Sequence, residues 1–189
     1  MFSKSWMKRR LLEVTVMLML LILAADSFAV VPARGKNAAN TACLLLLLKA
    51  KSTPPPMDFE EQVVALTNQQ RQAYGCAPLT MDTRLRAAAA GHSKDMAVND
   101  FFSHTGTGNT SPFDRIYAQG YSFSRAGENI AAGYTSPESV VNAWMNSEGH
   151  RANILNCGFI HIGVGHYYLQ NDTGNVNYGH YWTQVFGSP

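Results

Sequence analysis

The sequence predicts an α+β domain, specifically an α-β-α sandwich in which a mainly antiparallel sheet lies between layers of helices. Apolar residues recur at helical spacing through the middle of the chain, and residues that cap helix N-termini precede these runs. From Phe159 onward the apolar residues alternate with other residues, which is typical of a strand. Several helices followed by a terminal pair of strands favour the α+β class.

The N-terminal part of the chain has a different character. Basic residues precede an apolar run from Leu11 to Ala25, and Ser27-Phe28-Ala29 supplies the small residues that precede a cleavage site. This order predicts that residues 1–29 are a secretory signal peptide. The alternative is an uncleaved membrane anchor, but the apolar run of about fifteen residues is shorter than the ~20 that a spanning helix needs.

Residues 30–56 are predicted to be a flexible, Pro-rich linker that ends in the triple proline Pro54–Pro56. Inside it, Leu44 to Leu48 forms an apolar island that fits a small strand, an adhesive linker patch or a contact with a membrane surface. Cys43, just before this island, suggests a lipoprotein, but it lies well past the apolar run of the signal peptide. Asn40 also replaces the leucine that a lipidation signal carries three residues upstream.

The net charge also differs between residues 1–56 and the rest of the chain. Residues 1–56 hold eight of the fifteen basic residues and two of the thirteen acidic ones, so the rest of the chain has a net charge of −4. A nucleic-acid-binding domain needs a basic patch on its folded part, so this composition excludes nucleic acid as a partner. We expect residues 57–189 to form one secreted or envelope-located domain, monomeric and without a stable membrane span after signal removal.

Two helices are predicted at the start of this domain. Asp58, followed by Glu61, resembles a capping box and begins a helix over about 59–74. Asp82 caps a second helix, which ends near Asn99.

Two histidines belong to the second helix and the segment after it. His92 lies on the apolar face of the helix, where a core or cleft-floor histidine is expected more than a ligand. His104 stands where rigid structure gives way to the polar, glycine-rich loop 105–110. Such a boundary positions a side chain and leaves it accessible. The alternative is that His104 is a surface histidine that caps the preceding helix.

Ser-Pro pairs begin two further helices. Ser111-Pro112 starts a short helix that Gly120 ends, and Ser136-Pro137-Glu138 starts another whose buried face includes Trp144. Proline fits the first helical position because the backbone N–H that it lacks has no partner there.

The segment after Trp144 contains two candidate functional residues. Glu148 and His150 are two residues apart, so on a continuous helix they would point roughly 200° apart. Because Gly149 is a poor helix residue, we expect the chain to leave the helix there and both side chains to face one cleft. Glu128 is expected at the edge of packed structure. The alternative is a solvated Glu148 and a hydrogen-bonded loop histidine at position 150.

The C-terminal part predicts an antiparallel hairpin. From Phe159 to Gly165, isoleucine and valine alternate with histidine and glycine, which indicates a strand with one apolar face. Asn171 to Gly174 has the composition of a turn, and Tyr178 to Phe186 is the second strand.

Three cysteines are present. In an exported protein, Cys76 and Cys157 are expected to form a disulfide, which leaves Cys43 as the odd residue. The alternative is two free, buried thiols.

Five stretches, in order along the chain, resemble the CAP superfamily. They are Val64–Asn68 with Arg71, Phe102-Ser103-His104, Gly127–Ile130, Trp144–Leu155 and Tyr181–Phe186. This superfamily contains cysteine-rich secretory, antigen 5 and pathogenesis-related proteins, and the match is closest to its bacterial, SCP-like extracellular branch. The resemblance covers about residues 59–187. It implies an α-β-α sandwich and an extracellular location.

In eukaryotic CAP proteins a cleft holds two histidines and two glutamates, and some members bind a divalent cation there. The resemblance places His104 and Glu128 directly at two of these positions. The second glutamate position is Ser147 in this chain, with Glu148 one place later.

The second histidine position also departs from the family pattern. It is occupied by Tyr181, with His180 one place earlier. The bacterial-type Gly-His-Arg sequence offers His150 as the replacement imidazole.

The resemblance therefore makes His104, His150, Glu128 and Glu148 candidate ligands of a divalent cation. Imidazole and carboxylate groups suit Zn²⁺ best.

Two functions remain open. The first is an exported binding module that holds a cation and a lipid, peptide or envelope ligand. The second is a hydrolase of peptide or cell-wall material, in which His104, Glu128 and His150 are catalytic through a metal or as general bases. No His-Glu-x-x-His or Gly-x-Ser-x-Gly motif supports the second function. As a third alternative, the polar residues of the cleft only stabilise the fold.

Overall fold

The structure, a computed structural model, describes residues 56–189. These residues make up nearly all of one compact unit, Pro55–Pro189. The predictions of a signal peptide, of a linker up to Pro55, and of roles for Cys43 and the Leu44–Leu48 island lie outside the described residues. Within residues 56–189, no helix is long and apolar enough to cross a membrane.

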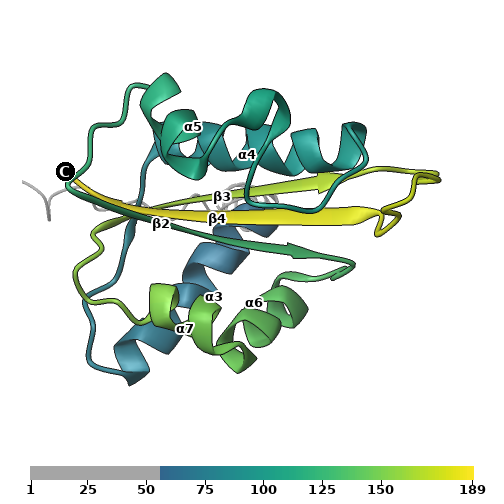
Figure 1. Cartoon of the computed structure of the whole chain (residues 1–189). Helices are drawn as coiled ribbons and strands as arrows, with labels where there is room; N and C mark the ends of the chain where they lie inside the picture. The colour runs from purple at the N-terminus through teal and green to yellow at the C-terminus, as the bar shows by residue number, and fades with distance from the viewer. Residues whose placement is uncertain (1–55) are drawn as a thin grey trace, which may run out of the picture. The chain divides into compact units, whose positions relative to one another are not determined.

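Helices lie on both faces of a four-stranded sheet (Figure 1), so the predicted α+β sandwich is confirmed. The elements follow in the order α3 (Phe59–Ala73), β1 (Thr80–Met81), α4 (Thr83–Val98), the 3₁₀ turn η1 (Thr107–Asn109), α5 (Pro112–Ala118), β2 (Arg125–Ala132), α6 (Pro137–Asn146), α7 (Glu148–Ile154), β3 (His161–Tyr168) and β4 (His180–Ser188).

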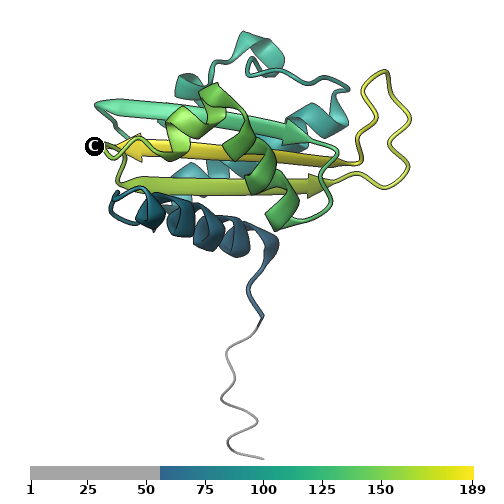
Figure 2. The ribbon, with the colours of Figure 1, turned by 90° about the horizontal axis from the view of Figure 1, so that it is seen from below.

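The strand order in the sheet is β1-β3-β4-β2. Both β2 and β3 pair antiparallel with β4, whereas the short β1 pairs parallel with β3. The three long strands lie side by side in the view from below (Figure 2), and β2 forms one edge of the sheet. Glu128, the central residue of the candidate site, lies on this edge strand.

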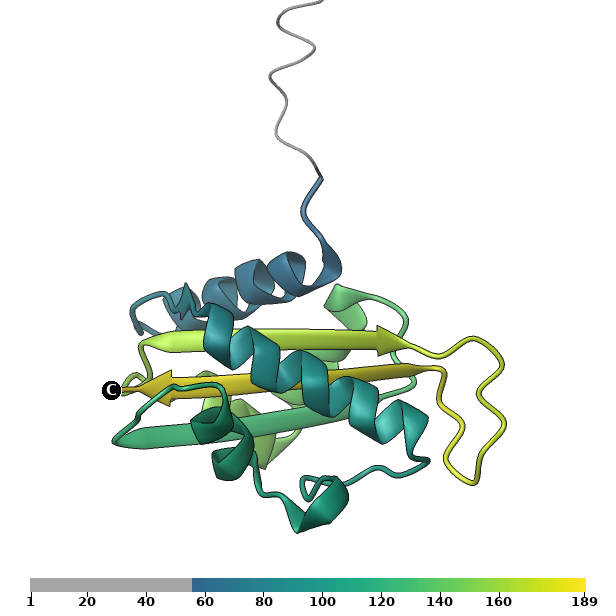
Figure 3. The same ribbon diagram turned by 90° about the horizontal axis from the view of Figure 1, so that it is seen from above.

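The two helical layers differ in how closely they approach the sheet. Helices α4 and α5 cover one face, and α3, α6 and α7 cover the other (Figure 1). Seen from above (Figure 3), α4 crosses directly over β3 and β4. A Cβ at Gly163 or Gly165 of β3 would collide with the backbone of α4 at Leu85 or Ala89. The expectation that this strand has one apolar face was incomplete, because its glycines pack against a helix on the other face.

The helix starts follow the sequence signals. Asp58 and Glu61 form a complete capping box at α3, and the side chain of Asp82 accepts hydrogen bonds from backbone N–H groups at the start of α4. Ser111 and Ser136 cap α5 and α6 in the same way. The predicted caps are therefore confirmed.

The end of α6 differs from the prediction. Ser147, with φ −99° and ψ 125°, interrupts the helix, and a new helix begins at Glu148. The chain therefore leaves the helix at Ser147, and Gly149 lies inside α7. The expectation that the chain is non-helical around Gly149 was wrong. Glycine costs only about 1 kcal/mol in a helix interior, which the packing of a helix can offset.

The strand boundaries also differ. Ile160 precedes β3 and is 53% exposed, and β4 begins and ends two residues later than the predicted strand. Sequence analysis did not identify β1 or β2 as strands. In β2 both faces are covered, so its residues show no alternation of apolar and polar types.

Two kinds of contact connect the end of α3 to the segment between α7 and β3. The predicted disulfide between Cys76 and Cys157 is present. The buried guanidinium of Arg71 donates hydrogen bonds to the backbone carbonyls of Ile154 and Asn156, both at 2.8 Å, and of Phe159 at 3.2 Å. These contacts position the start of β3 against the first helix.

Candidate functional site

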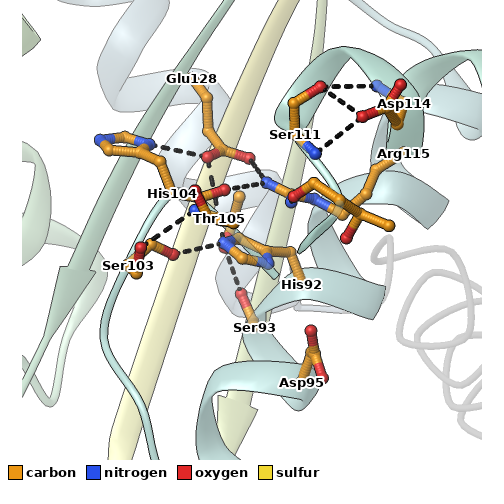
Figure 4. Close-up of polar contacts among 12 residues, drawn as sticks. His92, Ser93, Asp95, Ser103, His104, Thr105, Ser111, Asp114, Arg115 and Glu128 are labelled. Carbon is orange, nitrogen blue, oxygen red and sulfur yellow. Dashed lines mark hydrogen bonds and ion pairs between the residues drawn. The ribbon is translucent and has the colours of Figure 1, made fainter. Parts of the chain in front are cut away.

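Glu128 lies at the centre of the candidate site, on the edge strand β2, where it pairs in register with Val185. Its side chain is 3% exposed and points toward the face covered by α4 and α5 (Figure 4). The expectation that Glu128 lies at the edge of packed structure is confirmed. A buried carboxylate requires charged or hydrogen-bonding partners, and two residues supply them.

His104 and Arg115 each contact one oxygen of Glu128. The Nδ1 atom of His104 lies 2.8 Å from Oε1, and Nη2 of Arg115 lies 2.7 Å from Oε2. Arg115 also donates to the carbonyls of His104 and Thr110, at 3.0 and 2.9 Å. It thus fastens the loop that carries His104 to the strand that carries Glu128.

This arrangement selects one tautomer of the neutral His104 ring. An ionised carboxylate only accepts hydrogen bonds, so the Nδ1–H of His104 donates to Glu128 and Nε2 keeps its lone pair. The His104 side chain is 50% exposed, and Nε2 points away from Glu128 (Figure 4). His104 therefore presents an oriented, accessible nitrogen that could accept a proton or bind a cation.

His92 of α4 lies beneath this pair. Its side chain is fully buried, and its Nε2–H donates to the carbonyl of Ser103 at 2.9 Å, 4.0 Å from Oε1 of Glu128. Burial lowers the pKa of His92, which favours the neutral ring. Among the described residues, its buried Nδ1 has no hydrogen-bond partner. The expectation of a core or cleft-floor histidine is confirmed.

His150 approaches the site from α7. A hydrogen-bond network holds its backbone, because Nδ2 of Asn129 donates both to the carbonyl of His150 and to Oε1 of Gln184, at 3.1 and 3.0 Å. Asn153 extends the network to the carbonyl of Glu128 at 3.2 Å. Burial lowers the pKa of His150, and the charge of the nearby His104 lowers it further. The structure thus places His150 within electrostatic reach of His104.

Two other predicted residues are not brought into this group. Glu148 is exposed in the first turn of α7, and the helical spacing directs its side chain away from that of His150. His180 pairs in register with Tyr168, five residues along β4 from Val185, or about 17 Å from the register position of Glu128. Its Nδ1 instead meets Nε2 of His166 at 3.0 Å.

The donor set for a cation is small. Both oxygens of Glu128 are engaged, and the unpartnered Nδ1 of His92 is buried, so His104 and His150 are the imidazoles that could bind a cation. Across residues 56–189, no group of three or more His, Cys, Asp or Glu side chains is arranged to hold a metal ion. A closed structural zinc site needs four protein ligands and a catalytic one needs three. The zinc site therefore stays a prediction that these residues fit poorly.

A pocket of about 300 Å³ lies along the outer edge of β2, and His150 is part of its wall. Its lining is mainly apolar and aromatic, with Ser147 and His150 as the polar members. The lining residues are Phe102, Ile130, Ala131, Ala132, Tyr134, Ala143, Trp144, Ser147, His150 and Tyr178. No lysine, arginine, aspartate or glutamate belongs to this set, so the pocket favours an uncharged, apolar group.

A model of the cysteine-rich secretory protein (CAP) family matches residues 64–186, which is more than half of the chain. The chain belongs to the CAP family. The resemblance that the five motifs indicated is therefore confirmed.

Two bacterial relatives are similar to this CAP protein. It is 48% identical over 128 residues to the uncharacterized protein YkwD of Bacillus subtilis (strain 168), covering 68% of this chain and 46% of YkwD. It is 43% identical over 115 residues to the uncharacterized membrane protein YlbC of the same organism, covering 59% of this chain and 33% of YlbC. The match thus spans less than half of either relative.

Two solved structures are also similar to this chain. An extracellular protein containing an SCP domain, from Bacillus anthracis str. Ames, is 35% identical with a TM-score of 0.60, covering 69% of this chain and 40% of that one. An outer surface protein from Borrelia burgdorferi, 24% identical with a TM-score of 0.61, shares the fold over 70% of this chain and 96% of that one.

Sequence analysis missed one residue of the CAP site, Arg115. This arginine lies within a short helix and belongs to none of the five motifs, so nothing in its neighbourhood marked it. Its role depends on two contacts across the fold, with Glu128 and with the backbone of His104. The sequence predicted only the start of α5, where Ser111 caps the helix.

Proposed function

We propose that this chain is an exported CAP protein that binds an apolar or amphipathic lipid, peptide or envelope ligand. The apolar part of the ligand occupies the pocket beside β2, and its polar part meets His104 and His150. Export is supported by the signal-like residues 1–29 and by two structural neighbours described as extracellular and outer surface proteins.

One observation carries this proposal. The pocket beside β2 has a mainly apolar and aromatic lining without charged side chains, and its wall includes His150 as well as Phe102, two residues before His104. Binding sites for small ligands combine a mostly apolar cavity with a few precisely held polar groups in this way. The Arg115 contact contributes because it keeps Glu128 and the His104 loop together in the absence of ligand.

The test measures binding of a fluorescent fatty acid to residues 55–189, a compact unit with its own core and disulfide. Ala143→Phe fills the pocket from α6 and should reduce binding at least tenfold. Asn142→Phe adds the same ring at the adjacent, exposed position and should leave binding unchanged. Equal binding by both variants would contradict a role for the pocket.

The cation is a separate part of the proposal. Zn²⁺ titrated into the same unit by calorimetry should bind weakly, because two imidazoles provide fewer protein ligands than zinc sites usually have. The His104→Ala variant should show no binding at this site. If the intact unit shows no saturable heat, the cation is excluded and the pocket remains as the binding site.

The second candidate function is general-base hydrolysis, and the His104–Glu128 pair favours it. A carboxylate that holds Nδ1–H of a histidine leaves Nε2 ready to accept a proton from water or a hydroxyl group. Glu128→Gln should abolish turnover of peptide or cell-wall material if the protein is an enzyme. In a binding module the same variant keeps ligand binding, and no turnover is seen before or after the change.

A further inference from the structure

We propose that the ligand is an extended peptide that pairs with the free edge of β2 and inserts one apolar side chain into the neighbouring pocket. This inference rests on the proposed function, because it uses the same pocket, and it specifies the chemical class of the ligand. Two independent features of the edge carry it: its unpaired backbone N–H groups and its position along the pocket.

The outward-facing residues of β2 follow from the register. The N–H of Gly133 donates to the carbonyl of His180 at 2.9 Å, so Gly133 faces β4. Backbone groups alternate between the two sides of a strand in an antiparallel ladder. Ile130 and Ala132 therefore direct their backbone groups away from β4, and β2 has no strand on that side.

The outward carbonyls and the outward N–H groups differ in what they contact. The carbonyl of Ile130 accepts from the indole of Trp144, and that of Glu128 accepts from Asn153, both at 3.2 Å. Within residues 56–189, by contrast, the N–H groups of Ile130 and Ala132 donate no hydrogen bond to a side chain or to a backbone carbonyl outside the strand ladder. The edge thus presents donors, and peptide carbonyls are the acceptors that match them.

The pocket supplies the second requirement for recognising a strand. Ile130 and Ala132, which carry the unpaired N–H groups, also line the pocket. Every second side chain of an added strand points to the same side, so one of them can enter this cavity while the backbone pairs with β2. Because the lining includes Phe102 and Tyr178, packed edge to face at 5.9 Å, an aromatic or branched aliphatic side chain suits it.

A peptide in this position would also approach the histidine site. Glu128 lies two residues from Ile130, or about 7 Å along the strand. Phe102, two residues before His104, lines the pocket, so a peptide paired at Ile130 and Ala132 would lie close to the segment that carries His104. An acyl chain would fill the pocket but leave the N–H groups of the edge without partners.

The experiment uses fluorescently labelled seven-residue peptides of alanine and serine with a central Ala, Leu, Phe or Trp, and measures polarisation with residues 55–189. Ala132→Pro removes one outward N–H without removing a bond to β4, a change that edge strands tolerate. Ala126→Pro makes the same change at an outward position of β2 that does not line the pocket, and serves as the matched control.

The expected result has three parts. The Phe or Trp peptide binds at least tenfold tighter than the Ala peptide. Ala132→Pro weakens this binding about tenfold, because a buried peptide carbonyl loses its donor. Ala126→Pro changes it less than twofold, and circular dichroism shows both variants folded.

Two results would overturn the inference, and the fatty-acid probe separates them from failure of the proposed function. If Ala132→Pro binds the peptides as tightly as the unchanged protein, pairing with the edge is wrong. If no peptide binds but the fatty acid does, and Ala143→Phe blocks it, the ligand class is wrong and the proposed function stands. If neither probe binds, both proposals are wrong.

Discussion

Two pairs of side chains in this domain contain histidine: His104 with Glu128, and His166 with His180. They differ in the partner of the histidine nitrogen. His104 donates to Glu128 and keeps Nε2 accessible at the edge of the sheet. His166 and His180 hydrogen-bond to each other at 3.0 Å, and the ring of His166 stacks on Trp182 at 4.0 Å between centroids. His104 thus contacts a carboxylate through one ring nitrogen, whereas His166 and His180 contact each other, each through one ring nitrogen.

The comparison indicates that the burial of a histidine ring and the type of its partner decide whether the ring stays accessible to a ligand. Burial and the neighbouring His180 lower the pKa of His166 to about 4, so this ring stays neutral at physiological pH. His104 instead has a carboxylate partner and an exposed ring. Three changes test whether the two pairs differ in this way.

The largest effect is expected from Glu128→Ala. This change leaves the guanidinium of Arg115, 13% exposed, without its carboxylate, so we expect the free energy of unfolding to fall by about 3 kcal/mol. Glu148→Ala, which removes an exposed carboxylate, should cost less than about 0.5 kcal/mol. Urea denaturation of both variants measures the difference, and equal costs would show that the Arg115 contact contributes little.

A loss of stability of intermediate size is expected when the pH is lowered through the range in which His166 binds a proton. Because the pKa of His166 is lowered to about 4 in the folded protein, the unfolded chain binds the proton first as the pH falls below about 6.5. Stability is therefore full above that pH and is lost between about 6.5 and 4. Solvent screening of the partly exposed ring reduces the loss to about 1–2 kcal/mol.

Substitution of His166 isolates this contribution. His166→Phe keeps an aromatic ring on Trp182 and removes the titrating group, so its stability should fall less steeply over the same pH range. His92 and His150, whose pKa values are also lowered by burial, contribute over the same range, so only the difference between the two slopes reports on His166. An unchanged slope in the His166→Phe variant would contradict this account.

The smallest effect is expected from His104→Ala. The ring is half exposed, so its loss should change the free energy of unfolding by less than about 1 kcal/mol at pH 7. Ligand or cation binding, rather than stability, should respond. A cost above about 2 kcal/mol in urea denaturation would instead favour the alternative in which the cleft residues only stabilise the fold.

The sequence predicted those parts of the structure that local chemistry determines. Asp58 and Ser136 marked helix starts because capping depends on residues within one turn. The pairing of Cys76 with Cys157 was predicted from the expectation of export and from the presence of two cysteines in the part expected to fold.

The features that were missed depend on contacts between distant segments. Strand β2 is covered on both faces, so Gly127 to Ala132 lacks the alternation that identifies a strand. Helix α7 includes Gly149 because Asn153, one turn later, hydrogen-bonds to Glu128 and Asn129 of β2. The position of Arg115 beside Glu128 is likewise visible only in three dimensions.

The contacts of Arg71 have a consequence for how far the domain depends on its covalent bond. Its guanidinium already connects α3 to the carbonyls of Ile154 and Asn156, the same two segments that the cysteines join. None of these hydrogen bonds requires the thiols of Cys76 and Cys157 to be oxidised. Breaking the disulfide with a reducing agent would therefore leave a second, noncovalent link between the same two segments.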